Sequence, residues 1–378
     1  MARMLKIDVT AGDILPGLQS FLKSVLTQEA VSALLVPLHL PMKARVMPTL
    51  VSDPARLDAA DPLAPAFPLN AARLAARLTR RGAGGRIAAV LRPCEIRALV
   101  ELVKLKQAST EDLILIGTDC LGALTNRDYT RYAAKIGAEA TAAFCRSILA
   151  EGRPPAEFDL APACRVCEHP AAEGADIRIG LYGAAPGGPL WAEARTPKGE
   201  ALLEQLGAAA AEAPTGRSAA LAALVAERSA RRDAMFAATR EQTGSLEKLS
   251  TYLAACVNCF NCRVACPVCY CRECVFVTDV FDHEPFQYLK WAHRKGAVKM
   301  PTDTIFFHLT RLAHISTSCV GCGQCSNACP NDIAVMELFR SVSHRTQAAF
   351  GYEAGRNLEE APPLAVFKED EFGEVAGL

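Results

Sequence analysis

Apolar and polar positions alternate in two different ways over the first 150 residues. Short continuous apolar runs, such as LILIG at 113–117, are typical of strands that are buried on both faces. Between these runs, apolar residues recur at the period of an amphipathic helix. Strands that alternate with helices favour an α/β fold with a mostly parallel sheet. The predicted strands are 31–38, 86–93 and 112–119, and the predicted helices are 17–28, 69–81 and 95–107.

The rest of the chain changes character several times, and 378 residues are too many for one ordinary core. Proline, glycine and alanine are frequent up to about residue 200, an alanine-rich helical pattern follows, and cysteines then dominate. We therefore predict an N-terminal α/β domain (1–200), a helical linker (201–254), a ferredoxin-like module (255–340) with an insertion at 275–318, and a loose C-terminal extension (341–378).

Charge and hydropathy exclude several classes of protein. Lysine and arginine together number 41, as do aspartate and glutamate, so neither a nucleic-acid partner nor an anionic lipid surface is indicated. No stretch is long and apolar enough for a transmembrane helix, and the N-terminus lacks the apolar core of a signal peptide. These features predict a cytoplasmic protein.

Sixteen cysteines are many for such a chain, and eleven of them lie between Cys256 and Cys329. Thiols stay reduced in the cytosol, where clustered cysteines indicate metal binding and not disulfides. Two segments, CVNCFNCRVACP from Cys256 and CVGCGQCSNACP from Cys319, fit the pattern C-x2-C-x2-C-x3-C-P. This pattern is typical of ferredoxins with two [4Fe–4S] clusters, whereas zinc ribbons use two separate CxxC pairs.

In two-cluster ferredoxins, the fourth cysteine of each run binds the cluster of the other run. The sequence therefore predicts two ligand sets. The first set is Cys256, Cys259, Cys262 and Cys329. The second set is Cys266, Cys319, Cys322 and Cys325.

Three further cysteines follow the first run at once, in PVCYCREC, and we call Cys269, Cys271 and Cys274 the cysteine trio. One interpretation is a further metal site, which would hold a third ferredoxin-type cluster or zinc. The other is that they are free thiols. Both stay open, because no fourth ligand is identifiable nearby. His308 and His314 precede the second run, and there a structural role or a hydrogen bond to a cluster ligand is commoner than ligation.

Four other cysteines are scattered over the α/β domain. Cys94 and Cys120 each follow a predicted strand, where open α/β sheets bind ligands, and Cys164 and Cys167 form a CxxC pair. This dispersed set could hold one more [4Fe–4S] cluster, although cysteines at strand ends are often small buried apolar residues. Cys145 lies in a helical pattern and is expected in the core.

Several blocks resemble the coenzyme F420 hydrogenase/dehydrogenase beta subunit family, and within it the formate dehydrogenase type. They include MPTLVSDPARL, RPCEIRALVELVKLKQ, LILIGTDCLGALT, CRVCEHPAAEGADIRIGLYG and both cysteine runs, and they cover about 45–335. The resemblance implies that the dispersed set holds a [4Fe–4S] cluster near a flavin, FAD, in an α/β domain joined to a ferredoxin domain. The Gly-Gly-x-Val-Thr-type loop of flavin-binding members is absent, because the corresponding place reads AGDILPGLQSFL.

The resemblance implies an iron–sulfur electron-transfer subunit of an oxidoreductase complex. Its partner subunit would be a catalytic subunit of the formate dehydrogenase, hydrogenase or heterodisulfide reductase type. It would exchange electrons with a soluble carrier such as F420. Two alternatives stay open: an adaptor that has lost its flavin, and a stand-alone flavin and iron–sulfur reductase. No Ser-His-Asp order, Walker loop or HExxH helix is present, so no catalytic residue is assigned.

Overall fold

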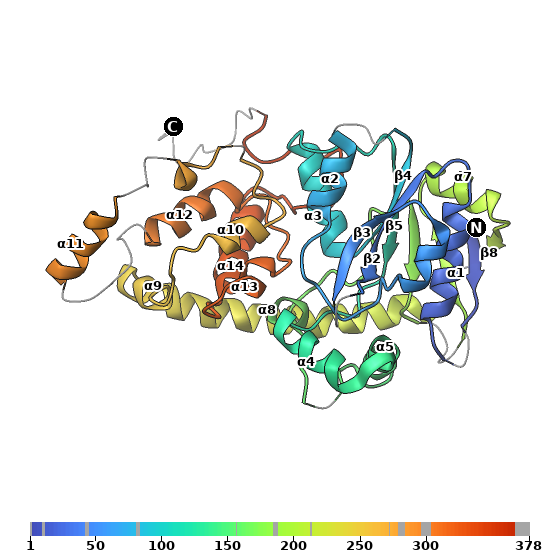
Figure 1. Ribbon diagram of the computed structural model, residues 1–378, viewed down its shortest axis with the longest axis horizontal. Coiled ribbons are helices and arrows are strands. Elements are labelled where there is room, and N and C mark those ends of the chain that lie inside the picture. The colour runs from blue at the N-terminus through green and yellow to red at the C-terminus, as the bar shows by residue number, and fades with distance from the viewer. Residues whose placement is uncertain are drawn as a thin grey trace.

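The protein has a sheet-containing part and a cysteine-rich helical part, joined by a long helix (Figure 1). The helix α8 (Arg217–Thr243) runs along both parts, and α9 (Leu246–Tyr252) continues toward the cysteines. The computed structural model describes residues 2–9, 12–41, 45–80, 84–155, 157–183, 188–211, 214–271, 273–278, 284–295 and 304–366.

The described strands form one sheet in the order β3-β2-β4-β5-β6-β7-β1-β8. The central strands β2, β4, β5 and β6 pair in parallel, and the strands on either side add antiparallel pairs. The three predicted strands are β2, β4 and β5, so the prediction of an α/β fold with a parallel arrangement is confirmed at its centre. The strands are β1 (Ala2–Ile7), β2 (Ala33–His39), β3 (Val46–Val51), β4 (Ile87–Leu91), β5 (Leu113–Thr118), β6 (Ile177–Gly180), β7 (Leu190–Ala194) and β8 (Ala209–Ala211).

Helices cover both faces of this sheet, and the three predicted helices are found as α1, α2 and α3 (Figure 1). The turn into α3 is fixed by Glu95, whose carboxylate accepts the backbone N–H groups of Arg92 at 2.9 Å and Ala71 at 2.7 Å. Pro93 occupies the first turn, where its missing N–H costs nothing. The helices are α1 (Leu15–Leu26), α2 (Ala72–Arg80), α3 (Pro93–Lys104), α4 (Asn126–Ile136), α5 (Ala140–Glu151), α6 (Pro162–Arg165) and α7 (Pro197–Gln205).

Two predicted boundaries differ from the structure. The α/β domain does not end at 200, because α7 leads into β8, which pairs with β1 at the edge of the sheet. The region from 341 is not loose at its start: α14 (Val335–Ala349) is largely buried, and Tyr352 and Ala354 are 6% and 0% exposed. Alanine-rich and polar composition hid both features, because β8 is a strand only through its pairing with β1, and the segment after 341 is buried by contacts with distant parts of the chain.

The ferredoxin-like module shares a core with the α/β domain. Leu91 and Leu99 lie in the same apolar cluster as Phe307 and Phe339. The insertion contributes α12 to this core, while part of it (279–283 and 296–303) lies outside the described residues. The module consists of α10 (Asn261–Ala265), a 3-10 turn (Val275–Val277), α11 (Pro285–Lys295), α12 (Thr304–Ile315), α13 (Gln324–Asn327) and α14.

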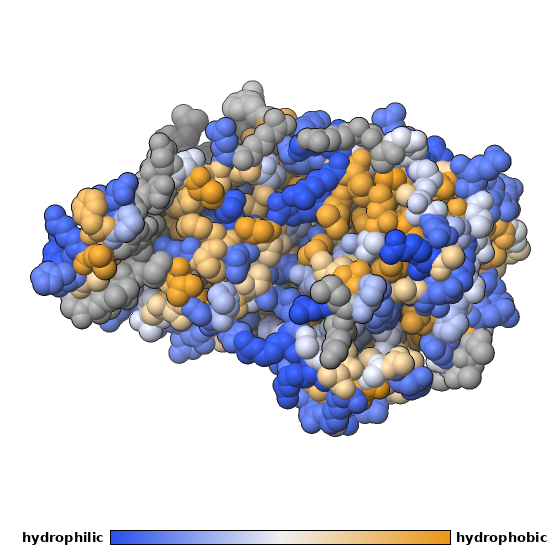
Figure 2. Space-filling view, viewed as in Figure 1, coloured by the Kyte–Doolittle hydropathy of each residue, from blue (hydrophilic) through white to orange (hydrophobic). Residues whose placement is uncertain are grey.

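The visible face carries apolar residues over the sheet and over the module, with hydrophilic residues around them (Figure 2). In the module, large apolar side chains such as Val264, Val277 and Phe306 are more than half exposed. Among the described helices, none is both long enough and apolar enough to cross a membrane.

Candidate metal centres

The four cysteines of the first set surround one cavity. Three of them come from α10 and the loop before it, and the fourth follows α13. Asn258 and Phe260 in the loop have positive φ angles of 50° and 58°, so the backbone curls tightly between the thiols. The lining cysteines are Cys256, Cys259, Cys262 and Cys329.

The four cysteines of the second set surround another cavity. They are Cys266, Cys319, Cys322 and Cys325. Gly321 and Gly323 in this loop have φ angles of 67° and 76°, which favour glycine. A Cβ at Gly323 would lie 2.3 Å from the Cβ of Ala163, so this glycine also lets the module approach the α/β domain. In each set, the fourth cysteine comes from the other run: Cys329 lines the first cavity and Cys266 lines the second. This is the grouping that the sequence predicted, and the binding of clusters by these cysteines stays a prediction.

Cys262 and Cys266 are buried, Cys259 is exposed, and the other cysteines of these two sets are partly exposed. Burial raises the pKa of Cys266 to about 12 and raises the pKa of Cys325 well above its ordinary value. The thiolate form of each cysteine is favourable only when positive charge lies close. The iron of a cluster would provide that charge. The donor chemistry therefore fits [4Fe–4S] clusters.

One buried guanidinium lies between the two cavities. Arg311, on α12, is 3% exposed and donates to Cys262 Sγ at 3.1 Å and to the Cys262 carbonyl at 3.2 Å. Its guanidinium lies over the rings of Phe307 and Phe339, with centroids 5.5 and 4.7 Å away. Although burial opposes its charge, the nearby Cys262 and Cys266 thiols raise the pKa of Arg311. Arg311 thus remains a cation beside both sets, a role that the sequence analysis missed.

His308 lies one helical turn before Arg311 and faces the first set. Its Nε2 is 3.4 Å from Cys256 Sγ, and His308 is 1% exposed. Burial, and then the charge of Arg311, lowers the pKa of His308 to about 4, so its ring is neutral. A thiolate at Cys256 can only accept, so Nε2 would carry the proton and donate to it. The sequence predicted a structural role or a hydrogen bond to a ligand cysteine for this histidine, and the contact agrees with the second. Arg311 lies three residues after His308 on the same helix, and this spacing could have indicated that Arg311 faces the cysteines too.

The dispersed set is brought together at the carboxyl edge of the parallel strands. Cys94 lies in the first turn of α3 after β4, Cys120 follows β5, Cys164 lies in α6 and Cys167 follows it. Cys120 donates its backbone N–H to the Pro170 carbonyl at 2.8 Å, which ties β5 to the CxxC segment. The sequence predicted this edge for Cys94 and Cys120, but only the folded chain shows that the CxxC pair joins them.

Gly122 lies beside the dispersed set and has a φ of 97°, which is in the glycine region. A Cβ there would lie 2.9 Å from a methyl group of Leu160, so the glycine lets Leu160 pack against the loop after Cys120, while its distance of 3.5 Å from the Cβ of Cys164 is an ordinary contact. Burial raises the pKa of Cys164 to about 12, with contributions from Cys120 and Cys167. Burial also raises the pKa of Cys94 well above normal, with Glu95, Cys120, Cys322 and Cys167 adding to the effect. Cys164 of the dispersed set and Cys322 of the second set line one cavity, so the two sets are neighbours.

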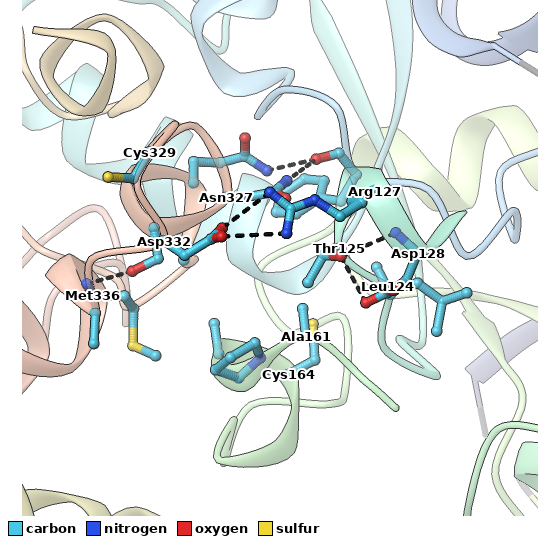
Figure 3. Close-up of a pocket in the computed structure, with 18 of the residues that line it drawn as sticks. Leu124, Thr125, Arg127, Asp128, Ala161, Cys164, Asn327, Cys329, Asp332 and Met336 are labelled. Carbon is cyan, nitrogen blue, oxygen red and sulfur yellow. Dashed lines mark hydrogen bonds and ion pairs between the residues drawn. The ribbon is translucent and has the colours of Figure 1, made fainter. Parts of the chain in front are cut away.

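A larger cavity of about 410 Å³ lies between the two parts of the protein (Figure 3). Cys164, Cys322 and Cys329, one thiol from each of the three sets, line it. Arg127 reaches across to Asp332, with Nη1 and Oδ2 3.2 Å apart. The cavity is thus a space bordered by all three candidate centres.

The cysteine trio lines a cavity of its own, which His314 also lines. Cys145 is 4% exposed in the main apolar core, as expected. Among the described side chains, no three His, Cys, Asp or Glu groups could hold a single metal ion. Thiols that surround a cavity suit a cluster, in which each iron atom takes its own ligand.

The segment AGDILPGLQSFL stands where flavin-binding relatives have their glycine loop, and from residue 12 on it packs against the sheet. Gly17 lies within α1, where a Cβ would be 2.1 Å from the carbonyl oxygen of Asp8. The glycine therefore allows α1 to pack on the end of β1. Residues 10 and 11 lie outside the described part, as do residues 184–187 of the later glycine-rich segment.

Comparison with known proteins assigns a family match to each part. Residues 84–214, which contain the dispersed set, match the family described as the C terminus of the beta subunit of coenzyme F420 hydrogenase/dehydrogenase. Residues 252–333, which contain the other sets and the trio, match a 4Fe–4S dicluster domain.

Two curated relatives align over most of the chain. F420-dependent formate dehydrogenase subunit beta of Methanocaldococcus jannaschii is 26% identical over 79% of this chain and 80% of the relative. F420-dependent formate dehydrogenase 1 subunit beta of Methanococcus maripaludis is 27% identical over 74% and 75%. A solved chain of the F420-reducing [NiFe] hydrogenase complex of Methanosarcina barkeri matches with a TM-score of 0.46 and 13% identity, over 65% of this chain and 93% of that one.

Proposed function

We propose that this chain, a member of the coenzyme F420 hydrogenase/dehydrogenase beta subunit family, is the iron–sulfur electron-transfer subunit of a formate dehydrogenase or hydrogenase type complex. The observation that carries the proposal is the proximity of the three cysteine sets. Cys164, Cys322 and Cys329, one from each set, line one cavity, and Arg311 donates to Cys262 of the first set while it lines the cavity of the second set. Three neighbouring clusters would form a path along which single electrons move.

The proposal assigns the ligands as the spacing predicts. Cys256, Cys259, Cys262 and Cys329 would hold one [4Fe–4S] cluster, and Cys266, Cys319, Cys322 and Cys325 would hold a second. Cys94, Cys120, Cys164 and Cys167 would hold a third. Support comes from Arg311 and His308, whose N–H groups reach cysteine sulfur atoms, and from the burial of Cys262 and Cys266.

FAD belongs to this proposal as the group that would exchange electron pairs with a soluble carrier such as F420. A bound flavin accepts hydride and releases electrons singly, which links a two-electron carrier to clusters. The cavity of Figure 3 is the candidate place for its ring, because Phe67, Leu124 and Met336 give apolar walls and Cys164 adjoins it. Gln324 and Thr125 would offer polar groups at the same cavity.

A catalytic partner of the formate dehydrogenase, hydrogenase or heterodisulfide reductase type would supply or take the electrons. Support comes from the exposed apolar side chains of the module, among them Val264, Val277 and Phe306, which a partner would cover. The absence of the glycine loop favours the alternative that the chain is an adaptor without flavin.

Anaerobic purification from the native source would test the proposal. We expect at least about twelve iron atoms per chain, following four per cubane, and a co-purifying protein that contains molybdenum, tungsten or nickel. Flavin in an acid extract would distinguish the relay from the flavin-free adaptor. A chain that purifies alone with flavin and reduces an organic substrate would favour the stand-alone reductase. Eight iron atoms or fewer would refute the third cluster.

A further inference from the structure

The cysteine trio lies at a site that the three proposed clusters do not use. Cys269, Cys271 and Cys274 line one cavity of about 170 Å³, together with His314. Cys271 is exposed, and Cys269 and Cys274 are partly exposed, so the cavity is at the surface of the module. Three thiols within six residues are one ligand short of a cubane.

We propose that the cysteine trio and His314 hold a further [4Fe–4S] cluster, which carries single electrons between the second set's cluster and a redox centre of the partner. The metal site stands on its own geometry, whereas its transfer role rests on the function proposed above. In each transfer the neighbouring reduced cluster loses one electron and this cluster gains it.

The fourth ligand comes from another element. His314 lies in the last turn of α12, three residues after Arg311, and both side chains line the trio's cavity. Glu273 lines it too, but imidazole suits iron better than a carboxylate does when the other ligands are thiolates. The helix that donates to the first set at His308 would therefore ligate this cluster at its other end.

The surroundings suit a cluster of negative charge. Arg263 and Arg311 line the cavity, so two guanidinium groups lie beside the three thiols. The buried Nε of Arg263 has no hydrogen-bond partner within the described structure, and neither has Nε of Arg311. Buried donors are normally satisfied, and the sulfur atoms of a cluster would provide acceptors. A zinc ion would need its ligands gathered around one point, which the described groups do not offer.

The position suits transfer to and from the second set. Val268, Arg311 and Ile315 line both the trio's cavity and the cavity of the second set. Cys269 follows Cys266, a member of the second set, by three residues. Tyr270 and Val275 also line the trio's cavity, and their exposed side chains would be covered by a partner protein.

Metal analysis of anaerobically purified, cluster-loaded full-length chain tests the proposal. We expect about sixteen iron atoms in the wild type, and about twelve in Cys274→Ser with the remaining cluster signals unchanged. Nitrogen hyperfine coupling in pulsed EPR of the reduced protein should reveal the imidazole ligand. His314→Cys should keep the iron and lose this coupling. Cys145→Ser and His344→Ala, a core thiol and an exposed imidazole outside the trio's cavity, serve as matched controls.

Three results would overturn the assignment. Twelve iron atoms without zinc in the wild type would mean that the trio consists of free thiols. One zinc atom that disappears in Cys274→Ser would make the site a zinc site. Coupling that persists in His314→Cys would exclude His314 as the ligand. None of these affects the iron of the first, second and dispersed sets, on which the proposed function depends.

Discussion

Replacing Arg311 by leucine should lower the reduction potential of the first set's cluster. Arg311 is buried and donates to Cys262 Sγ at 3.1 Å, so its charge interacts directly with a proposed ligand. A cluster becomes more negative when it takes up an electron, and a nearby cation stabilises that reduced state more than the oxidised one. Leucine fills much of the same space but removes the charge and the hydrogen bonds.

The expected size follows from the contact. Two unit charges about 4 Å apart interact by roughly 4 kcal/mol at an effective dielectric constant of about 20, which is an upper limit because the added electron is spread over the cluster. Hydrogen bonds to charged groups contribute about 1.5–3 kcal/mol. A difference of about 2 kcal/mol corresponds to roughly 85 mV for one electron. We expect a shift of that order at the first set and a smaller one at the second.

EPR-monitored redox titration of the wild type and Arg311→Leu would measure this shift. An iron count must first show that both proteins hold the same number of clusters. Arg345→Leu, which removes an exposed arginine of α14, is the matched control and should leave the potentials unchanged. Arg311→Lys should restore much of the potential because it keeps the charge. Unchanged or higher potentials in Arg311→Leu, with full iron content, would refute the reasoning.

Three further predictions concern the dispersed set, the joint between the two parts and a buried ion pair. Cys120→Ser should remove about four iron atoms and leave the ferredoxin-type EPR signals intact; unchanged iron would show that Cys120 is not a ligand. Gly323→Ala should destabilise the protein by about 2–3 kcal/mol, because the new Cβ meets Ala163 at 2.3 Å and the φ of 76° is strained. Gly351→Ala is the control, because Gly351 has a φ of 60° but no atom within 4 Å of the new Cβ, and it should cost only about 1 kcal/mol. If both variants lost the same stability in anaerobic thermal unfolding, the contact between position 323 and Ala163 would not be the cause. Asp119→Asn should leave the guanidinium of Arg217, which donates to Asp119 at 2.8 Å, buried without this carboxylate. A loss of about 3 kcal/mol would lower the melting temperature of a chain of 378 residues by about 4 °C, since the unfolding entropy is about 2.1 cal/mol/K per residue. A change of less than about 1 °C would show that this ion pair contributes little.

The apolar runs predicted the centre of the sheet because β4 and β5 are buried along their whole length. A strand of this kind can be identified from its own apolar run, without knowledge of the strands that pair with it. The edge strands were missed for the opposite reason: β8 is three alanines, exposed or partly exposed, and only its pairing with β1 makes it a strand. The packed segment at Tyr352 was also missed, because its burial depends on contacts such as that with Glu101, where the two side chains meet at 2.6 Å.

The sequence alone determined the grouping of cysteines within each ferredoxin run, since ligands two or three residues apart lie on one tight loop whatever the rest of the chain does. It also predicted the strand ends that carry Cys94 and Cys120. Only the tertiary structure decided which distant side chains join them. The CxxC pair reaches the edge of the sheet, Arg311 contacts Cys262 and lines the cavity of the second set, and His314 lines the trio's cavity. These pairings depend on how α12 and α6 pack, and packing is set by the whole core and not by local spacing.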